Sequence, residues 1–246
     1  MLWNSAGSLS KFARLTLRLH RATALPLVQW PKAPCSGQAF ALKSSSVYTD
    51  PRKDFSLPNP SWKKELMAHY NKFMELTKSG SWERIPSYNV TVLHISDTEP
   101  TEVRSTRLYT RNLDIEGTGL EYAMFLNREE KKVVGLFQIG PYLEGPPSFM
   151  HGGCIATVID VVTGTCAVFT VGKVLTANLN INYRKPIPLG SVIVVEGKVE
   201  KIEGKKIFLS SQVRSADDTI LHNEASALFI LLDWKAGQDS PLALEH

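Results

Sequence analysis

Cysteine is scarce in this chain: only Cys35, Cys154 and Cys166 occur among its 246 residues. Cys154 and Cys166 fall in one predicted helix, where a rise of about 1.5 Å per residue separates them by roughly 18 Å. That distance excludes a disulfide between them within one chain. So few thiols give no indication of an oxidising compartment or of a metal site, and we expect neither a metal nor a cofactor.

Two other features that the sequence lacks reduce the range of possible functions. No uninterrupted apolar run reaches the ~18 residues expected of a membrane-spanning helix. No Gly-x-Ser-x-Gly segment is present, which argues against a hydrolase of the Ser-His-Asp type. The apolar and charged fractions, 43% and 21%, are those of a globular protein with enough apolar material for a full core.

Acidic residues are missing from the N-terminal segment, where the first one is Asp50. Residues 1–40 carry five of the 28 basic residues, so the formal charge of +4 comes from this segment and the remainder of the chain has a net charge of −1. The main part of the chain is therefore not basic, and nucleic-acid binding is not expected.

This N-terminal segment is typical of a mitochondrial transit peptide. On a helix its arginines share one face and its apolar residues share another. The first group comprises Arg14, Arg18 and Arg21, and the second Phe12, Leu15 and Leu19. We interpret residues 1–48 as such a leader, which predicts a mitochondrial location in the matrix, with the cytoplasm as a second location. A disordered basic tail is the alternative interpretation.

Three further segments follow the leader. Residues 49–106 are predicted to hold a proline-rich linker, a helix over about 62–78 that Ser61 caps, and an irregular stretch packed on the main domain. Residues 107–233 are predicted to form that domain, and residues 234–246 a C-terminal tail.

Strand patterns dominate the main domain. Apolar-rich runs predict strands at residues 108–113, 120–126, 132–138, 174–184, 191–202, 207–215 and 220–232. A helix is predicted over about residues 152–169, after the third run. It is apolar nearly all round, as a buried helix is. The continuous apolar stretch 227–232 predicts a strand covered on both faces. This order favours an α+β fold in which one antiparallel sheet wraps one long buried helix.

His151, Gly152 and Gly153 open the predicted buried helix. Paired glycines let a ligand approach the backbone closely, and a helix N-terminus presents unpaired N–H donors with a partial positive charge. Such a site suits a carbonyl oxygen that becomes an oxyanion. Glycines between a loop and a helix are more often structural, so the motif alone is weak.

Asp160 lies in the middle of the same apolar helix. A carboxylate in such surroundings is costly unless it is paired or hydrated. It is either hydrogen-bonded to neighbouring backbone, or a base or nucleophile that faces a polar cavity, and the surrounding sequence favours neither.

The strand after this helix is unusually rich in asparagine, which strands disfavour. Strict alternation places two sets of side chains on opposite faces. One set is Ala177, Leu179, Ile181 and Tyr183, and the other is Thr176, Asn178, Asn180, Asn182 and Arg184. The polar set indicates either plain solvent exposure or a surface for a ligand.

A group of basic residues surrounds the predicted tight turn at Glu203-Gly204-Lys205. Lys201, Lys205 and Lys206, with Arg184 on the sheet, would suit phosphate groups. Lysines at a turn are usually only solvated, which is the alternative.

These motifs together resemble the hotdog-fold acyl-CoA thioesterases, through His151-Gly152-Gly153, the aspartate nine residues after this histidine, and the polar strand. A subgroup, thioesterase superfamily members 4 and 5, is similar over Pro141–Pro147, Asn59–Trp62 and Gly80–Trp82, and Lys185–Pro188 slightly favours member 4. The resemblance covers about residues 54–232. It implies a hotdog fold and hydrolysis of medium- or long-chain fatty acyl-CoA to a fatty acid and CoA.

The resemblance also implies catalytic roles. Asp160 matches the catalytic acid, acting as a general base on water or as a nucleophile, and the sequence does not choose between these mechanisms. The Gly152 N–H matches the oxyanion donor, supported by His151 and Gly153. Thr176 matches a position that helps to place the water.

Asn182, Arg184, Lys205 and Lys206 match positions that touch the CoA portion. The chain departs from the family pattern at one place: some members carry an asparagine six residues before the histidine of the motif, and this position is Gly145 here. One polar group that could order the water is therefore missing.

Partners follow from the same resemblance. A homodimer, or a higher oligomer, is expected, because one helix cannot bring Gly152 and Asp160 to the same thioester. A regulatory protein that binds a kinase of the Akt type on a hotdog scaffold is the alternative function. An acyl-CoA dehydratase is disfavoured, because the helix carries no catalytic histidine of its own.

Overall fold

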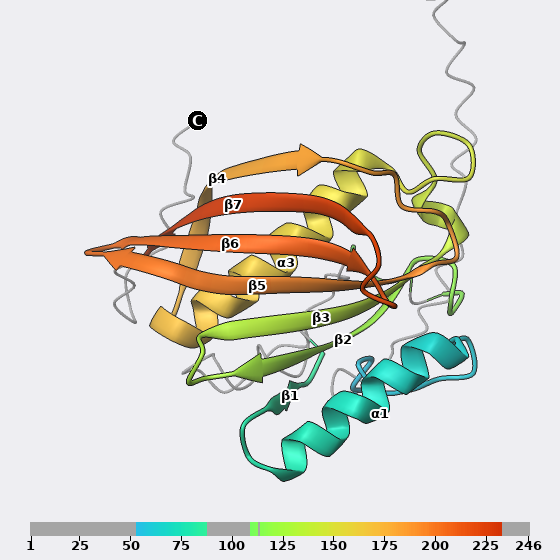
Figure 1. Cartoon of the computed structure of the whole chain (residues 1–246), viewed down its shortest axis with the longest axis horizontal. Coiled ribbons are helices and arrows are strands. Elements are labelled where there is room, and N and C mark those ends of the chain that lie inside the picture. The colour runs from blue at the N-terminus through green and yellow to red at the C-terminus, as the bar shows by residue number, and fades with distance from the viewer. Residues whose placement is uncertain (1–52, 88–108, 113, 233–246) are drawn as a thin grey trace, which may run out of the picture. The chain divides into compact units, whose positions relative to one another are not determined.

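A computed structural model describes residues 53–87, 109–112 and 114–232 of the chain. All of the predicted leader and all of the C-terminal tail lie outside these residues. One sheet of seven strands dominates the described part, in the order β1-β2-β3-β5-β6-β7-β4, and all neighbours are antiparallel (Figure 1). The strands are β1 (Glu83–Ile85), β2 (Leu120–Asn127), β3 (Lys132–Ile139), β4 (Val174–Tyr183), β5 (Val192–Glu203), β6 (Lys206–Ser215) and β7 (Leu221–Leu231).

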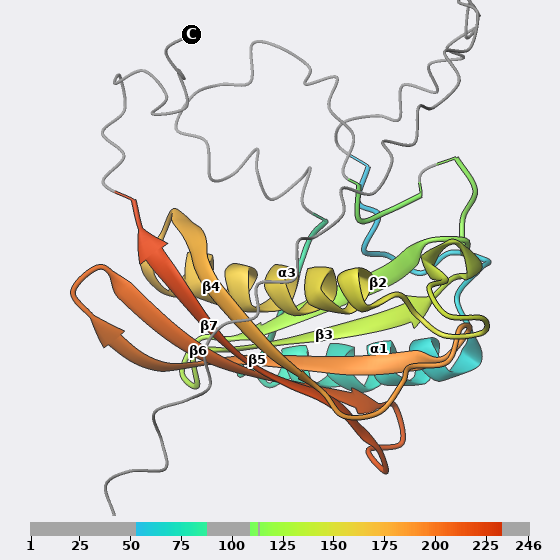
Figure 2. The same ribbon diagram turned by 90° about the horizontal axis from the view of Figure 1, so that it is seen from above.

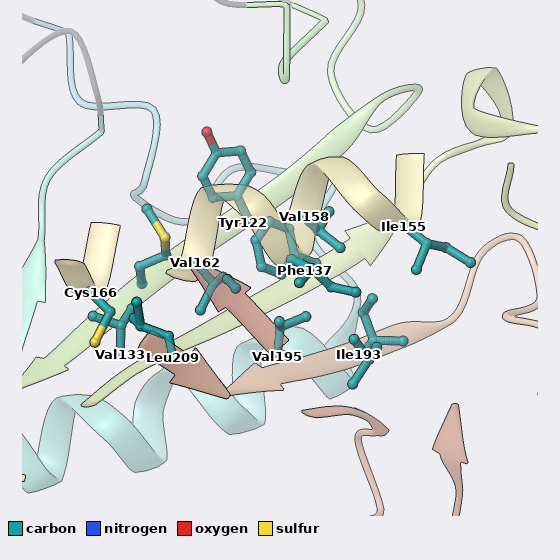
Figure 3. Packing of buried hydrophobic residues seen from close by; sticks show 14 of the residues in the cluster. Tyr122, Val133, Phe137, Ile155, Val158, Val162, Cys166, Ile193, Val195 and Leu209 are labelled. Atoms are coloured by element: carbon teal, nitrogen blue, oxygen red, sulfur yellow. The ribbon is translucent and has the colours of Figure 1, made fainter. Parts of the chain in front are cut away.

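Helix α3 (Gly152–Val171) lies across the concave side of this sheet, which curls around it (Figure 2). One face of α3 is buried against the sheet, where it packs among branched aliphatic and aromatic side chains (Figure 3). By length and composition alone α3 could also cross a membrane, but here its buried face is part of the protein core. The predicted α+β hotdog arrangement is confirmed.

The opposite face of α3 is only half-buried, although the sequence predicted burial all round. Ala156, Asp160, Val161 and Gly164 on this face are partly exposed, whereas Val158 and Val162 are fully buried. Strand β4 at the end of the sheet is also largely exposed. A single chain therefore leaves apolar helix surface and a strand edge uncovered.

Two strand predictions are wrong in detail. Residues 109–112, expected in a strand, form a turn and loop instead. In β7, Ala227 and Phe229 are buried but Leu228 and Ile230 are partly exposed, so only one face of this strand is covered. The reason is that the second helix packs on another part of the sheet, so it does not cover the outer faces of β6 and β7.

That second helix, α1 (Lys64–Lys78), begins two residues later than predicted, and Ser61 does not cap it. The Ser61 hydroxyl donates to Asn59 Oδ1 at 2.6 Å instead. The Gln138 amide of β3 instead binds the segment just before the helix: its Nε2 donates to Ser61 O at 2.9 Å, and its Oε1 accepts from Lys63 N at 2.7 Å. A side chain of the sheet thus holds the segment that leads into α1.

Helix α1 packs on the convex face of β2 and β3, opposite α3 (Figure 2). Leu66 and Tyr70 are its buried anchors, and Phe73 stacks on Phe125 of β2 with 4.9 Å between ring centroids. β2 is consequently buried on both faces.

A buried carboxylate ties the segment before α1 to the sheet. Glu121 of β2 accepts hydrogen bonds from Trp62 Nε1 at 3.2 Å, Asn59 Nδ2 at 3.0 Å and Gly117 N at 2.9 Å. The buried guanidinium of Arg111 lies 4.0 Å from the same carboxylate. Burying this pair is tolerable because each charge has a counter-charge and hydrogen bonds.

We predict that Glu121→Ala lowers the free energy of unfolding by about 3 kcal/mol or more, because it leaves a buried guanidinium without its carboxylate. Urea denaturation measures the change. Glu75→Ala is the matched control, since it removes a carboxylate from an exposed pair with Lys78, and exposed pairs contribute at most about 1 kcal/mol. Equal losses in the two variants would contradict the role of Glu121.

Candidate active site

The first turn of α3 is organised by His151. This residue is the N-cap, and its Nδ1 accepts a hydrogen bond from the Gly153 N–H at 2.9 Å. The Gly153 donor is therefore occupied. The Gly152 N–H donates to no acceptor among the described residues and remains the donor available to a ligand oxygen, at the positive end of the helix.

Tyr183 of β4 holds the same turn from the other side. Its hydroxyl donates to Gly152 O at 3.1 Å. A Cβ built on Gly152 would meet the Tyr183 ring at 3.7 Å, an ordinary contact, so the glycine is not required by crowding within the chain. The sequence signal for Tyr183 was its place on the same strand face as Leu179 and Ile181, but nothing in the pattern indicated a hydrogen bond to the helix.

Asp160 lies on the half-buried face of α3, two turns after Gly152. Thr176 Oγ1 donates to Asp160 Oδ1 at 2.8 Å. This bond orients the carboxylate and leaves its other oxygen for water or substrate. Thr176 and Asp160, both predicted as site residues, are thus in direct contact.

The contact exists because β4 contains a bulge at Ala177. Thr176 pairs with Phe229 and Asn178 pairs with Leu228, so Ala177 is an extra residue with no partner position. Partners across a ladder share a face, and Phe229 points into the core, so Thr176 faces α3. Strict alternation had placed Thr176 with the asparagines, and this prediction is wrong because a bulge shifts the period by one residue.

The residues predicted to touch CoA do not form one cluster within a single chain. Arg184 lies just past the end of β4, and its Nε donates to Glu224 Oε2 at 2.7 Å. Lys205 and Lys206 lie at the opposite end of the sheet, beside the β5–β6 turn. The eight steps along β6 from Lys206 to Arg214, the end where Arg184 lies, span about 26 Å at ~3.3 Å per residue.

Asn182 accompanies Arg184 on the outer face of β4, where it pairs with Glu224. Lys201, at the other end of the sheet, forms an ion pair with Glu203. The sequence predicted that Arg184 and these lysines form one group. Within a single chain they lie at opposite ends of the sheet.

Gly145 is a glycine for a steric reason. A Cβ at this position would lie 2.7 Å from His151 Cα, closer than real contacts allow. The asparagine that some thioesterases carry here has no room unless the His151 loop moves, so the polar group it would supply has to come from elsewhere.

Neither of the two cysteines in the described part of the chain is a candidate nucleophile. Burial raises the pKa of the Cys166 thiol to about 11, and burial also raises the pKa of Cys154. Thiols are reactive as thiolates, and these two remain protonated at neutral pH. Among the described residues no group of His, Cys, Asp and Glu could hold a metal ion.

A cavity of about 430 Å³ lies beside the first turns of α3. Cys154 and Thr157 of the helix line one side, and Tyr142, Leu143 and Leu120 are among the residues lining the others. Polar and charged residues, among them Arg111, Asn112 and Asp114, line the rest of it.

The arrangement combines an oriented carboxylate with a free N–H at a helix N-terminus, the two groups that thioester hydrolysis needs for nucleophile and oxyanion. They are not close to each other. Eight residues of one helix separate Gly152 from Asp160, about 12 Å at ~1.5 Å per residue. One chain therefore carries both halves of a site but cannot bring them to one carbonyl.

Comparison with known proteins points the same way. Residues 148–222 match the model of the Thioesterase superfamily. The chain is 56% identical to acyl-coenzyme A thioesterase THEM4 of Xenopus laevis over 199 residues, which cover 81% of this chain and 88% of the relative. It is 47% identical to THEM4 of Rattus norvegicus, with coverages of 77% and 85%, and 38% identical to THEM5 of Mus musculus, with coverages of 73% and 75%.

More distant matches are partial. A mitochondrial membrane protein of Saccharomyces cerevisiae, FMP10, is 26% identical over 46% of this chain and 48% of its own length. Among solved structures, zebra fish thioesterase superfamily member 2 aligns with a TM-score of 0.42 and 19% identity, covering 46% of this chain and 81% of that one.

Proposed function

The chain belongs to the THEM4 and THEM5 family of acyl-coenzyme A thioesterases, and from this premise we propose that Asp160 and the Gly152 N–H carry the hydrolysis of medium- or long-chain fatty acyl-CoA. The observation that supports these roles most directly is the Thr176–Asp160 hydrogen bond, which orients a carboxylate on the open face of an apolar helix. The Gly152 N–H stabilises the oxyanion. Asp160 either activates a water or attacks the thioester itself.

The proposed active form is a homodimer with two shared sites. The uncovered edge of β4 and the half-buried face of α3 lie side by side and would both be covered by a second copy. In a two-fold arrangement α3 runs antiparallel to its copy, so Gly152 of one chain faces the partner's Asp160. The oxyanion donor and the carboxylate then meet at one thioester.

The same symmetry would bring together the residues predicted to touch CoA, which lie far apart within one chain. Antiparallel pairing of β4 with its copy extends the sheet and places the Arg184 end of one chain beside the Leu175 end of the other. Leu175 aligns across β7 with the start of β6, so the partner's Lys205 and the partner's Lys206 come to the same end as Asn182 and Arg184. Four residues that one chain holds apart would then face one CoA.

We predict that Asp160→Asn lowers kcat by about 100-fold or more, because general-base catalysis typically contributes 10²–10⁴-fold, while the fold survives this nearly isosteric change. Thiol release from palmitoyl-CoA measures turnover, and circular dichroism checks the fold. Glu200→Gln is the control, since it neutralises an exposed carboxylate bonded to Ser210. Retention of more than about a tenth of wild-type kcat would remove Asp160 from the chemistry.

The shared site is tested by complementation. Asp160→Asn and Gly152→Val should each be inactive alone. In a mixture refolded together, random assembly makes about half of the dimers heterodimers, each with one intact and one doubly altered site, so activity returns to about a quarter of wild type. Continued inactivity, with heterodimers demonstrated by native mass spectrometry, would refute the shared site.

Residues 1–48 are proposed to direct the protein to the mitochondrial matrix, with the cytoplasm as a second location. Their composition supports this, because they are rich in arginine and contain no acidic residue. A fluorescent reporter fused to residues 1–48 should accumulate in mitochondria, whereas the same fusion with Arg14, Arg18 and Arg21 changed to Gln should stay in the cytosol. Cytosolic fluorescence from both fusions would contradict the proposal.

A further inference from the structure

Strand β4 contacts both chemical groups of the proposed site. Near its start, Thr176 Oγ1 donates to Asp160 Oδ1 at 2.8 Å. At its last residue, the Tyr183 hydroxyl donates to Gly152 O at 3.1 Å. The roles proposed above use the first contact and give no role to the second. The Tyr183 hydroxyl is therefore a polar group beside the proposed oxyanion donor that the mechanism does not yet use.

The two peptide units that open α3 contain four polar backbone groups, and three of these are hydrogen-bonded. In the first unit, His151 O accepts from Ile155 N at 3.1 Å. In the second unit, Gly152 O accepts from the Tyr183 hydroxyl, and Gly153 N donates to His151 Nδ1 at 2.9 Å. The fourth group is the Gly152 N–H, which has no acceptor in the part of the chain that the structure describes.

The second peptide unit is thus held at both of its ends, by Tyr183 on its oxygen and by His151 on its N–H. Because a peptide unit is planar, two hydrogen bonds at opposite ends fix its orientation. This unit joins two glycines, whose backbone dihedral angles are less restricted than those of any other residue. The Gly152 N–H is attached to the Cα atom that begins this unit, so its direction depends on how firmly the unit is held.

The surroundings of Tyr183 argue against a role in core packing. Its side chain is 55% exposed, whereas Val213 and Ile193 on the inner face of the sheet are fully buried. A Cβ built on Gly152 would lie 3.7 Å from the Tyr183 ring, so the ring lies near the turn without crowding it. What tyrosine supplies here beyond phenylalanine is the hydroxyl group on Gly152 O.

We propose that Tyr183 is a positioning residue for thioester hydrolysis, which fixes the direction of the Gly152 N–H by holding the carbonyl group of the same residue. The inference rests on the proposed role of Gly152 as oxyanion donor. Such a donor is effective only about 2.7–3.1 Å from the developing oxyanion and in good alignment, so a loosely held turn lowers the rate. The hydroxyl acts through the backbone of the turn and not by contact with the thioester.

The first test separates kcat from KM with palmitoyl-CoA. Tyr183→Phe keeps the ring and removes the hydroxyl, and it should lower kcat about tenfold, the effect of about one neutral hydrogen bond. KM should stay within about twofold of the wild-type value, because an interaction that matters only in the transition state changes kcat. Circular dichroism checks that the variant folds.

Tyr109→Phe is the matched control. The Tyr109 hydroxyl also donates to α3, to Thr157 Oγ1 at 3.1 Å, but it does not contact the first two peptide units of the helix. Its removal should leave kcat within about twofold of the wild type. Equal losses of kcat in the two variants would indicate general anchoring of the helix and overturn the proposal. An unchanged kcat in Tyr183→Phe, or a loss confined to KM, would overturn it as well.

The second test needs no turnover. Palmitoyl-CoA labelled at its carbonyl carbon is bound to Asp160→Asn, and isotope-edited infrared difference spectroscopy measures the carbonyl stretching frequency. A hydrogen bond from the Gly152 N–H polarises the carbonyl group and lowers this frequency below that of free palmitoyl-CoA. Adding Tyr183→Phe should return the frequency most of the way to the free value, whereas adding Tyr109→Phe should leave it lowered.

The infrared result distinguishes failure of the inference from failure of the function on which it rests. A carbonyl frequency that is not lowered in Asp160→Asn would contradict the donor role of Gly152, and the positioning role of Tyr183 with it. A lowered frequency that does not respond to Tyr183→Phe would overturn the role of Tyr183 alone.

Discussion

Packing of one face of α3 against a single curved sheet is the constraint on which the rest of the structure depends. The helix is apolar around most of its circumference, yet one sheet covers only part of it. The covered part forms the core with β2, β3, β5, β6 and β7. The uncovered part carries Asp160 and lies beside the exposed strand β4. Core formation and the partial exposure of the Asp160 carboxylate are thus two consequences of the same geometry.

The bulge at Ala177 connects this geometry to chemistry. Without it, Thr176 would point to the outer side of the sheet, as the alternation of the strand predicts. One additional residue in β4 turns Thr176 towards α3 and allows its hydroxyl to bind Asp160. Residues 178–182 keep the regular alternation, so the same strand presents the Thr176–Asp160 contact on one face and Asn182 on the other.

The two helices divide the sheet between them. α1 covers β2 and β3 from outside, and the Gln138 amide and the Glu121 carboxylate bind the segment that leads into it. The first turn of α1 also reaches towards the end of β7, where Glu65 and His222 are among the residues that line a cavity. The N-terminal helix therefore does more than cover apolar surface, because it also contributes a residue to the lining of this cavity.

Much of the fold and several candidate site residues could be predicted from the sequence by itself. Hydrophobic periodicity predicted six of the strands, the core helix and the α+β class, since burial imposes periods of 2 and 3.6 residues directly on the sequence. His151, Gly152 and Asp160 stood out because glycine pairs and buried carboxylates are locally costly and so conspicuous. Tertiary structure alone decided the contact of Thr176 with Asp160, the hydroxyl of Tyr183 on Gly152, the separation of Arg184 from Lys206 and the cavity at His222. Each of these depends on strand register, on a bulge or on the meeting of distant segments, and such long-range pairing leaves no periodic trace along the chain.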